Sequence, residues 1–517
     1  MFSKIMKNLR GMIKIKSIIL AAGIGSRLNP ITLEKPKCMV KVNGIPIIEH
    51  QIRAYLSSGV KIDSINVVVG YKSDFVKDFI KENYPGIKII ENKDYLSTNN
   101  MYSLYLALKD LKIDDNSFIL ISNGDCVYDP DIIKNLVEDN GSDLIACDRS
   151  SHIAESMKIK VDNGTIIDIS KEIPEKSAYA VSIDLYKIGF QNSQKLKEIL
   201  ETYILKKKDL NLWTEVALKD LLAYSKFKPF DINGRKWMEI DNLDDLAEAD
   251  IKFSNIDLDQ KKCFIMDLDG TVYLGNKPIE GTINFVNSRI DKNDFYFLTN
   301  NTSRVPLDYV KRLSSIGIET SSEKIISPVY PLFDYLNEKN ISKIFLVANS
   351  KFTNYMCREF KGLEITDDPS KCQAVVLAYD TELTYEKLKT ASLLLQKDEN
   401  IQFLATHIDM FCPTEEGNIP DIGSMTLVIQ ETTGRSPDKI FGKPNKVLLE
   451  NIDKTYDSNE VVVVGDRLHT DKKLAENLNY DFICVLSGET KRSDVDKLVA
   501  EDFPSLIVKD MGELLSN

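Results

Sequence analysis

The sequence lacks the cysteine pairs and long apolar runs that mark several common classes of protein. Its eight cysteines lie far apart and form no CxxC pair, which excludes a zinc knuckle or a disulfide framework and indicates reduced thiols. Apolar runs such as Val461–Val464 and Ala374–Ala378 have the length of strands and are too short to cross a membrane. The first fifteen residues are basic but lack the apolar stretch of a signal peptide. We therefore expect a cytoplasmic protein with no membrane partner.

Excess positive charge is also missing. The formal net charge is −12, and a chain that binds nucleic acid through its phosphates needs a basic surface, so nucleic acid is excluded as a general partner. A few local lysines and arginines still suffice for a small phosphorylated substrate. With 517 residues, 43% hydrophobic and 28% charged, the chain suits two globular domains of about 200–280 residues each.

Short β-branched runs alternate with longer amphipathic stretches along almost the whole chain, with no short-period repeat. This alternation predicts βαβ units and a mainly parallel sheet, that is, an α/β fold. The alternation restarts near residue 262, after a helical stretch at Leu243–Ile251. We expect domains at 14–252 and 262–517, joined by a short, stiff segment near Phe253–Lys262 that contains neither Gly nor Pro. The predicted strands are Ser17–Leu20, Ser64–Val69, Ile87–Ile90, Ser117–Ile121, Cys263–Leu268, Asp294–Leu298, Lys343–Val347, Ala374–Ala378 and Val461–Val464, and a helix is predicted at Ile47–Ser58.

A loop of small residues follows the first predicted strand. Ala22, Gly23 and Gly25 would let backbone N–H groups approach phosphate oxygens, and Arg27 and Lys37 would neutralise charge. The loop is neither a dinucleotide fingerprint, because the third glycine is absent, nor a P-loop, because no Gly-Lys-Ser/Thr follows. The Gly-x-Gly alone also fits an ordinary tight turn between a strand and a helix.

The longer string AAGIGSRLNPITLEKPKCMVKVNGIPIIEH, residues 21–50, resembles the signature of the sugar-phosphate and choline-phosphate nucleotidyltransferases. Two further marks of that family are present, Asn123-Gly124-Asp125 and Glu239-Ile240-Asp241. The segment from Ser97 to Tyr105 resembles the bacterial choline-phosphate cytidylyltransferase branch. The resemblance covers roughly residues 14–250 and implies a Rossmann-like mixed sheet that transfers CMP from CTP.

This resemblance also implies site residues. Asp125 and Asp241 would hold Mg²⁺, which lowers the repulsion between two anionic reactants. Alternatives remain for both aspartates, since each fits a turn or helix cap. Lys158 either reaches a phosphate or is solvated. Trp213, Trp237 and Tyr179 either hold a quaternary ammonium through cation–π contacts or pack in the core. The catalytic residues would be Arg27 and Lys37, and the nucleotide-binding residues Ala22, Gly23, Gly25 and Asn100.

In the second half, polar residues recur where predicted strands end. Asp267 and Asp269, one residue apart, suit nucleophilic phosphoryl transfer in which the first attacks and the second serves as acid and base. A hydroxyl and an amide come from Thr299 and Asn300, and Lys443 offers a positive charge. The run from Gly465 to Asp471 supplies further carboxylates.

The strings DLDGTVYLG, LTNNTSR, GKP and GDRLHTD occur in this order and resemble the haloacid dehalogenase superfamily, in particular its nitrophenyl-phosphatase and phosphoglycolate phosphatase type. The resemblance spans roughly 262–515 and implies a Rossmann-like core with an α/β cap at about 327–439. Two departures, His407 where an Asn is usual and His469 beside the predicted metal site, leave the substrate open. The implied roles are nucleophile for Asp267, acid and base for Asp269, phosphate binding for Thr299, Asn300 and Lys443, and metal binding for Asp267, Asp269 and Asp466, with support from Asp471.

Together these patterns predict a bifunctional, Mg²⁺-dependent enzyme of two α/β domains. Its substrates would be CTP, a phosphorylated alcohol such as phosphocholine or a polyol phosphate, and a phosphomonoester, and its product would serve surface or capsular polysaccharide or lipid decoration. One alternative is a sugar-1-phosphate nucleotidyltransferase that uses UTP, dTTP or GTP. Another is a chain in which one domain is catalytically silent and regulatory. A homo-oligomer also stays open.

Overall fold

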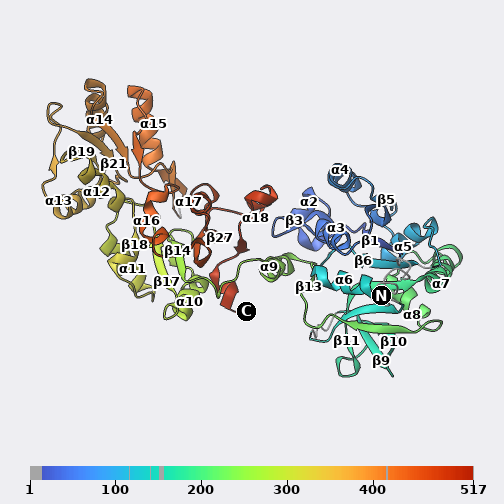
Figure 1. The fold of residues 1–517 in the computed structure, drawn as a ribbon. Helices are drawn as coiled ribbons and strands as arrows, with labels where there is room; N and C mark the ends of the chain where they lie inside the picture. Colours follow the sequence, from blue (N-terminus) through green and yellow to red (C-terminus); the bar gives the residue numbers. More distant parts are fainter. Residues whose placement is uncertain (1–13, 116, 140, 151–155, 415–416, 516–517) are drawn as a thin grey trace, which may run out of the picture. The chain divides into compact units, whose positions relative to one another are not determined.

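The computed structural model describes residues 14–115, 117–139, 141–150, 156–414 and 417–515. The prediction that no signal peptide is present concerns the basic first segment, and most of that segment lies outside these ranges. The chain divides between Phe253 and Ser254 into two compact units (Figure 1). None of the described helices is both long and apolar enough to cross a membrane.

The first unit is built on a mixed sheet of nine strands. The strands β1, β4, β5 and β6 run parallel to one another, and β11 pairs antiparallel with β6. The order is β10-β9-β11-β6-β1-β4-β5, and β8 and β12 extend it from β11. The strands are β1 (Lys14–Ala21), β4 (Ile65–Val69), β5 (Lys88–Glu91), β6 (Ser117–Asn123), β8 (Asp143–Asp148), β9 (Lys158–Asp162), β10 (Thr165–Ser170), β11 (Ala180–Gly189) and β12 (Phe227–Asp231).

Alternate side chains of each strand point to opposite faces of this sheet. Both faces are apolar, and helices cover both. Ile19 belongs to the apolar layer on one face, whereas Ile18 and Leu20 belong to the layer on the other. The strands β7 (Cys126–Tyr128) and β13 (Trp237–Glu239) form a separate antiparallel pair. The helices are α2 (Ile31–Glu34), α3 (Ile47–Ser57), α4 (Ser73–Asn83), α5 (Asn100–Lys109), α6 (Pro130–Glu138), α7 (Phe190–Glu201), α8 (Thr214–Leu221) and α9 (Leu243–Lys252).

The core of the second unit is a parallel sheet of six strands in the order β18-β17-β14-β26-β27-β28. Its central strands are continuous apolar runs, as expected for a sheet that is covered on both faces. The strands are β14 (Cys263–Asp267), β17 (Asp294–Leu298), β18 (Ile325–Ile326), β26 (Val461–Gly465), β27 (Asp481–Val485) and β28 (Leu506–Val508). The helices are α10 (Glu280–Arg289), α11 (Pro306–Ser315), α16 (Glu450–Asp453), α17 (Lys473–Leu478) and α18 (Arg492–Val495).

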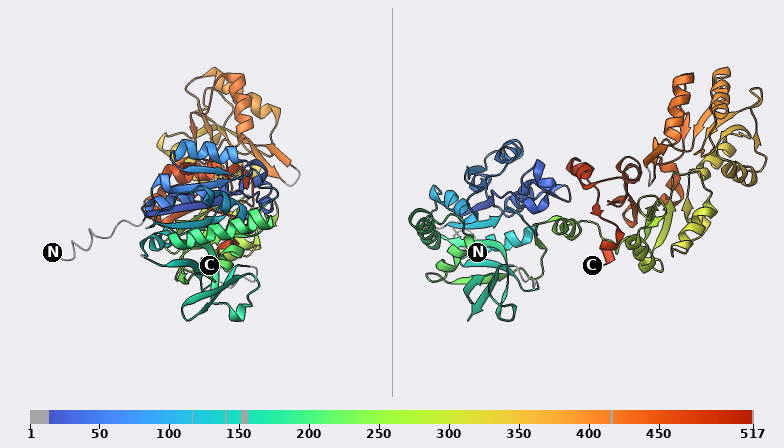
Figure 2. Two further views of the ribbon diagram at one scale, coloured as in Figure 1. Left: turned by 90° about the vertical axis from the view of Figure 1, so that its right-hand side faces the viewer. Right: turned by 180° about the vertical axis from the view of Figure 1, so that it is seen from behind.

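A second parallel sheet, of five strands, forms a distinct lobe of this unit, coloured brown to orange in Figures 1 and 2. We call this lobe, residues 327–439, the cap. Its strands are β19 (Lys343–Val347), β20 (Glu364–Ile365), β21 (Ala374–Leu377), β22 (Gln402–Ala405) and β25 (Lys439–Ile440), and a hairpin is formed by β23 (Phe411–Thr414) and β24 (Gly417–Pro420). Its helices are α12 (Val329–Glu338), α13 (Ser350–Glu359), α14 (Tyr385–Lys397) and α15 (Ile422–Thr433).

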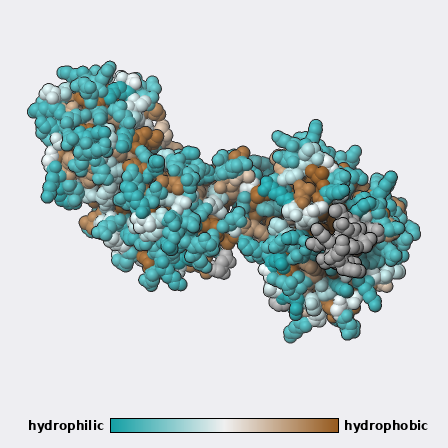
Figure 3. Space-filling model, in the orientation of Figure 1, coloured by the Kyte–Doolittle hydropathy of each residue, from teal (hydrophilic) through white to brown (hydrophobic). Residues whose placement is uncertain are grey.

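The predicted fold class, two α/β domains with one mixed and one mainly parallel sheet, is confirmed. The predicted strand at Asp294–Leu298 matches β17 in both bounds, and the predicted helix at Ile47–Ser58 ends one residue late. The visible surface of both units is mostly hydrophilic (Figure 3). Within each unit, several residues proposed for chemistry, such as Asp125 after β6 and Asp466 after β26, follow the carboxyl ends of parallel strands, where sheets of this kind place their binding crevices.

Candidate active sites

A cleft of about 750 Å³ opens in the first unit where β1 and β6 end. The predicted nucleotide-binding residues and both predicted cations line this cleft together with the two predicted metal ligands. Polar atoms therefore dominate one concave region, as a triphosphate requires. The predicted residues found there are Ala22, Gly23, Gly25, Arg27, Lys37, Asn100, Asp125 and Asp241.

Lys37 lies between the two predicted metal ligands. Its ammonium is 2.7 Å from a carboxylate oxygen of Asp125 and 2.7 Å from one of Asp241, and Arg27 pairs with the other oxygen of Asp241 at 2.8 Å. Burial alone would lower the pKa of Lys37, but the two carboxylates hold it above its usual value. Burial likewise opposes ionisation of Asp241, and Lys37 and Arg27 outweigh it, so the pKa of Asp241 is lowered.

The sequence prediction missed a third carboxylate of this cluster. Ligand oxygens of Asp125, Glu239 and Asp241 all lie within 4.8 Å of one another. Desolvation and then the charges of Asp125 and Asp241 raise the pKa of Glu239 to about 7. The Glu-x-Asp spacing contained the signal, because residues two apart on an extended segment face the same side.

Two more carboxylates, from β11 and α8, lie deeper in the cleft. Asp184 and Glu215 share one hydroxyl: the Tyr186 oxygen is 3.1 Å from Asp184 Oδ1 and 2.8 Å from Glu215 Oε1. Its single proton can satisfy only one of them at a time. Desolvation raises the pKa of both carboxyls, and their mutual repulsion raises that of Asp184 further. The charge of Lys171 limits the rise for Glu215, so this end of the cleft gathers acidic groups beside one lysine.

Two of the three aromatic candidates line the same cleft. Trp213 is 47% exposed, and the Lys171 ammonium lies 4.9 Å from the centre of its ring. Trp237 is buried and donates its indole N–H to Asp148 at 2.8 Å. Tyr179 is instead stacked by Arg149, 5.0 Å from the ring centre. An exposed indole beside carboxylates is a surface that favours cations.

Two of the alternatives considered for the first unit are decided by the geometry. The cap of α9 is Asn242, which accepts from the amides of Asp244 and Asp245, so the capping role falls to the neighbour of Asp241. A solvated Lys158 is wrong, because this side chain is buried on β9 and its ammonium donates to the carbonyl of Ser156 at 3.2 Å.

In the second unit, a buried lysine again lies between two aspartates. The Lys443 ammonium contacts Asp267 and donates to Asp471 Oδ1 at 2.6 Å. These three side chains are 4%, 8% and 0% exposed, respectively. Burial opposes the charge of Lys443, but the two aspartates raise its pKa, whereas desolvation raises that of Asp267. Lys443 thus supplies a positive charge that limits the rise in the pKa of Asp267.

Asp466 completes a group in which oxygens of Asp267, Asp466 and Asp471 lie within 4.8 Å of one another. Asp466 Oδ2 accepts from the Glu489 amide at 2.6 Å, whereas the buried Oδ1 has no hydrogen-bond partner among the described residues. Desolvation and Asp471 raise its pKa to about 6. Backbone presses on this carboxylate from two sides, because a Cβ on Gly270 or on Gly488 would overlap it. An unpartnered oxygen within an all-oxygen group fits a small hard cation.

The carboxylate of Asp269 stands apart from that group. Desolvation raises its pKa, and the charges of Arg312 and Arg304 limit the rise. The guanidinium of Arg312 itself lies over the ring of Tyr273, 3.5 Å from its centre. A carboxyl that holds its proton more tightly than usual suits a proton donor, so its surroundings agree with the predicted acid and base role.

The predicted phosphate-binding side chains lie at the ends of β17 and β25. Thr299 accepts from the Asn301 amide at 3.1 Å, and Asn300 Oδ1 accepts from the Lys443 amide at 2.8 Å. Thr299, Asn300 and Lys443 are all buried. The sequence could not show that Asn300 also contacts the cap, where its amide lies 3.2 Å from Asp409 Oδ2.

The two unusual histidines differ in setting. His407 is fully buried and its Nε2 is 3.0 Å from Asp421, which also caps α15 by accepting from the Ile422 amide. His469 is 63% exposed and 3.7 Å from Glu489. Asp421 therefore has a structural role in the cap, because it joins His407 to the start of α15.

Family models match both units. Residues 17–164 match the MobA-like NTP transferase domain, residues 264–359 match the haloacid dehalogenase-like hydrolases, and residues 440–514 match a second model of hydrolases of that type. The residues between the two hydrolase matches include most of the cap.

Known relatives match half of the chain. An acid sugar phosphatase from Staphylococcus saprophyticus is 29% identical over 260 residues, which are 49% of this chain and 96% of that protein. The Staphylococcus aureus acid sugar phosphatase is 28% identical and covers 50% and 98%, respectively. Among solved structures, a 4-nitrophenylphosphatase from Thermotoga maritima is 34% identical with a TM-score of 0.46, and covers 50% of this chain and 98% of its own. The second half of the chain therefore belongs to the haloacid dehalogenase-like hydrolases, the first half is an NTP transferase domain, and the protein is an enzyme that combines a transferase with a hydrolase.

Proposed function

We propose that the first unit transfers CMP from CTP to a phosphorylated alcohol and releases pyrophosphate. The observation that carries this proposal is the joint presence, in one cleft, of Arg27, Lys37 and the carboxylates of Asp125, Glu239 and Asp241. In this reaction an oxygen of the acceptor phosphate attacks the α-phosphorus, and the bond to the bridging oxygen breaks. Arg27 and Lys37 hold triphosphate oxygens, and no general base is needed because the attacking phosphate is already ionised.

The acidic end of the cleft supports a cationic amino alcohol, such as the choline of phosphocholine, over a neutral polyol. Asp184 and Glu215 are costly to bury as anions, and Lys171 is the cation that acts on Glu215. The exposed Trp213 ring offers a further cation–π surface. A cationic head group would stabilise the two carboxylates and the ring. Preference for cytosine rests on the resemblance of residues 97–105.

We propose Mg²⁺ as the cofactor of both units. In the first, Asp125, Asp241 and Glu239 would hold it; in the second, Asp267, Asp466 and a backbone carbonyl, with Asp471 in support. Carboxylate oxygens are the ligands that Mg²⁺ prefers, and the unpartnered oxygen of Asp466 fits such an ion. When bound, the ion neutralises charge on the phosphates during transfer.

We propose that the second unit hydrolyses a phosphomonoester through an aspartyl phosphate. An oxygen of Asp267 attacks phosphorus, and Asp269 gives its proton to the leaving alcohol. Asp269 then takes a proton from the water that hydrolyses the acyl phosphate. Lys443, Thr299 and Asn300 bind the phosphoryl oxygens. The raised pKa of Asp269 supports its role as the acid at neutral pH.

The experiment that tests the transferase is a panel of CTP, UTP, GTP and dTTP against choline, glycerol, polyol and sugar phosphates, with pyrophosphate release as the readout. We expect CTP with phosphocholine to turn over fastest. Equal or better turnover of UTP or dTTP with a sugar 1-phosphate would overturn the assignment. The hydrolase is tested on p-nitrophenyl phosphate and on the same acceptors.

No disulfide joins any of the eight cysteines, which supports a cytoplasmic site of action.

A further inference from the structure

Asp409 is a cap residue whose carboxylate lies against the core. It follows β22 and is only 8% exposed. Its Oδ2 is 3.2 Å from Arg467 Nη1 and 3.2 Å from the side-chain amide of Asn300. Neither of these partners belongs to the cap. A single cap carboxylate therefore contacts two loops of the core that follow different strands.

Both partners flank the phosphoryl site. The other end of the Asn300 side chain accepts from the Lys443 amide at 2.8 Å. Arg467 directly follows Asp466, its amide donates to Asp471 Oδ2 at 3.1 Å, and its Nε is 3.1 Å from Glu489. Asp409 thus fixes one end of the Asn300 side chain, whose other end meets Lys443, and one end of the Arg467 side chain, whose Nε meets Glu489. The amide of Glu489 in turn donates to Asp466.

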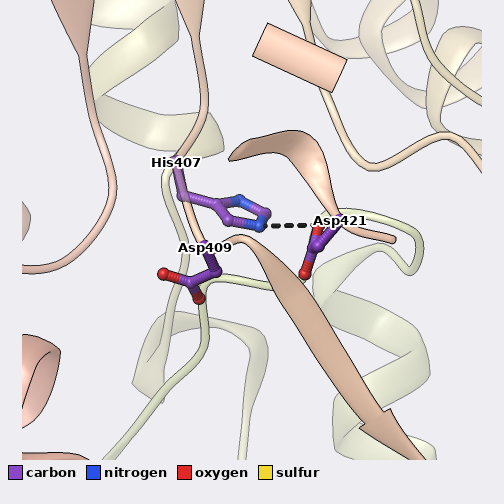
Figure 4. Close-up of side chains that lie close together, drawn as sticks. All are labelled: His407, Asp409 and Asp421. Atoms are coloured by element: carbon purple, nitrogen blue, oxygen red, sulfur yellow. Dashed lines mark hydrogen bonds and ion pairs between the residues drawn. The ribbon is translucent and has the colours of Figure 1, made fainter. Parts of the chain in front are cut away.

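The cap holds the backbone of Asp409 firmly. The Asp409 carbonyl accepts from the Gly423 amide at 2.8 Å, and the His407–Asp421 contact joins the segment before Asp409 to the start of α15 (Figure 4). A ring nitrogen of His407 and carboxylate oxygens of Asp409 and Asp421 also lie within 4.8 Å of one another. His407 therefore supports the backbone of Asp409 from within the cap and lies beside its carboxylate, which also contacts the core.

Other contacts show that the segment after β17 is shared between cap and core. Thr302 Oγ1 accepts from the Tyr379 amide at 2.8 Å and lies 3.3 Å from Thr406 Oγ1. The Asn349 side chain donates to the Ser303 carbonyl at 3.0 Å. These contacts fix the backbone that follows Asn300, whereas Asp409 is the cap residue that reaches the Asn300 side chain.

We propose that Asp409 is a positioning residue that couples the seating of the cap to phosphate binding, by orienting Asn300 and Arg467 for the phosphatase site. This inference rests on the proposed hydrolase function. When the cap is seated, both side chains have a charged partner and a fixed rotamer. Without Asp409, Asn300 must lose conformational freedom when phosphate binds, and Arg467 is left beside Asp466 with one counter-ion fewer.

The test is Asp409→Asn, which keeps the shape and removes the charge. The cap offers a matched control, because Asp438 pairs with Arg435 at the same 3.2 Å but within the cap, so Asp438→Asn should change nothing at the site. We expect Asp409→Asn to raise KM for p-nitrophenyl phosphate and the Ki of inorganic phosphate by about 10-fold, as the loss of a charged hydrogen bond does, with a smaller change in kcat. Asp409→Glu should restore part of the loss.

A second variant guards against misfolding. Arg467→Lys keeps the positive charge, but one ammonium replaces the two guanidinium nitrogens that reach Asp409 and Glu489, so phosphate affinity should fall in the same direction. Calorimetric titration with inorganic phosphate, in the presence of Mg²⁺, measures phosphate affinity without relying on turnover. An unchanged phosphate affinity in folded Asp409→Asn, or an equal loss in Asp438→Asn, would overturn it. A wild-type chain that binds phosphate without hydrolysing the ester would overturn only the hydrolase function, and a wild-type chain that binds none would overturn both.

Discussion

The two halves of the chain place a lysine between two aspartates, yet the two settings differ in burial. Lys37 and its partners Asp125 and Asp241 are 12%, 25% and 25% exposed, whereas Lys443 and its partners Asp267 and Asp471 are 4%, 8% and 0% exposed. The first site opens into a wide cleft, because a nucleoside triphosphate and an acceptor must enter together. The second site is more enclosed, which would favour the proposed attack of Asp267 on phosphorus by shielding the carboxylate from water.

This difference indicates that the same charge pattern serves two purposes. In the open cleft, the lysine can exchange its carboxylate partners for incoming phosphate oxygens. In the closed site, it must remain in place because its charge opposes the desolvation that raises the pKa of Asp267. The following predictions test this contrast in order of decreasing effect.

The largest effect should come from Asp267→Asn. An amide cannot form the acyl phosphate, so hydrolysis of p-nitrophenyl phosphate should fall roughly 10⁴-fold or more, while nucleotidyl transfer stays within about twofold. Steady-state assays of both reactions on one preparation measure this. Loss of both activities in a folded protein would contradict two independent sites.

Asp125→Ala should produce the converse result. Loss of a carboxylate that holds charge near the reacting phosphates should slow nucleotidyl transfer by roughly 10²–10³-fold, with hydrolysis of p-nitrophenyl phosphate nearly intact. Pyrophosphate release gives the measurement, and Asp131→Ala is a matched control, because this aspartate lies in the first turn of α6. If Asp125→Ala slowed nucleotidyl transfer less than Asp131→Ala does, Asp125 would not belong to the transferase site.

The burial contrast predicts unequal stability effects of the two lysines. Lys443→Met leaves two buried carboxylates without a counter-charge and should cost about 3–5 kcal/mol, whereas Lys37→Met, in the more exposed cluster, should cost about 1 kcal/mol. For units of this size, the melting temperature of the affected unit should fall by about 6–20 °C and about 2–4 °C, respectively. Calorimetry of the full chain measures both. Equal falls in melting temperature would show that the difference in exposure does not set how much each lysine stabilises its unit.

The smallest effect concerns the acidic end of the cleft. Glu215→Gln keeps the contact with Tyr186 but removes one charge, so KM for phosphocholine should rise about 10-fold with KM for CTP little changed. A neutral polyol phosphate as acceptor should be indifferent to the substitution, which makes it the internal control. A parallel rise for both acceptors would argue against a cationic head group at this position.

The sequence was sufficient where chemistry follows a strand directly. Asp125 comes after β6, Asp267 ends β14, and Asp466 comes after β26, so local patterns located them at the edges of sheets. The fold class followed from the same alternation of runs, because buried parallel strands are continuous apolar stretches.

Residues that join a site through tertiary contacts were not predictable in this way. Glu215 lies in a helix and Asp184 on a strand, and nothing in their neighbouring sequence marks them as acidic residues of a site. Asp409 lies in the Asn-x-Asp stretch of the resembled family, with His407 in place of the Asn, but that stretch does not reveal its partners. Only packing of distant segments brings Asp184 to the Tyr186 hydroxyl, or Asp409 to Arg467. Glu239 falls between these two groups, because its spacing from Asp241 is visible in the sequence but does not by itself assign it to the site.

The backbone that encloses Asp466 limits how this enzyme can diversify. Gly270 and Gly488 come from segments more than two hundred residues apart, and each leaves no room for a side chain beside the carboxylate. Substitution at either position would push against the Asp466 carboxylate, so the ion preference proposed for the second unit cannot be retuned from these neighbours. A directed-evolution library that seeks a new metal preference should therefore hold both glycines constant and vary Asp466, Asp471 and Glu489.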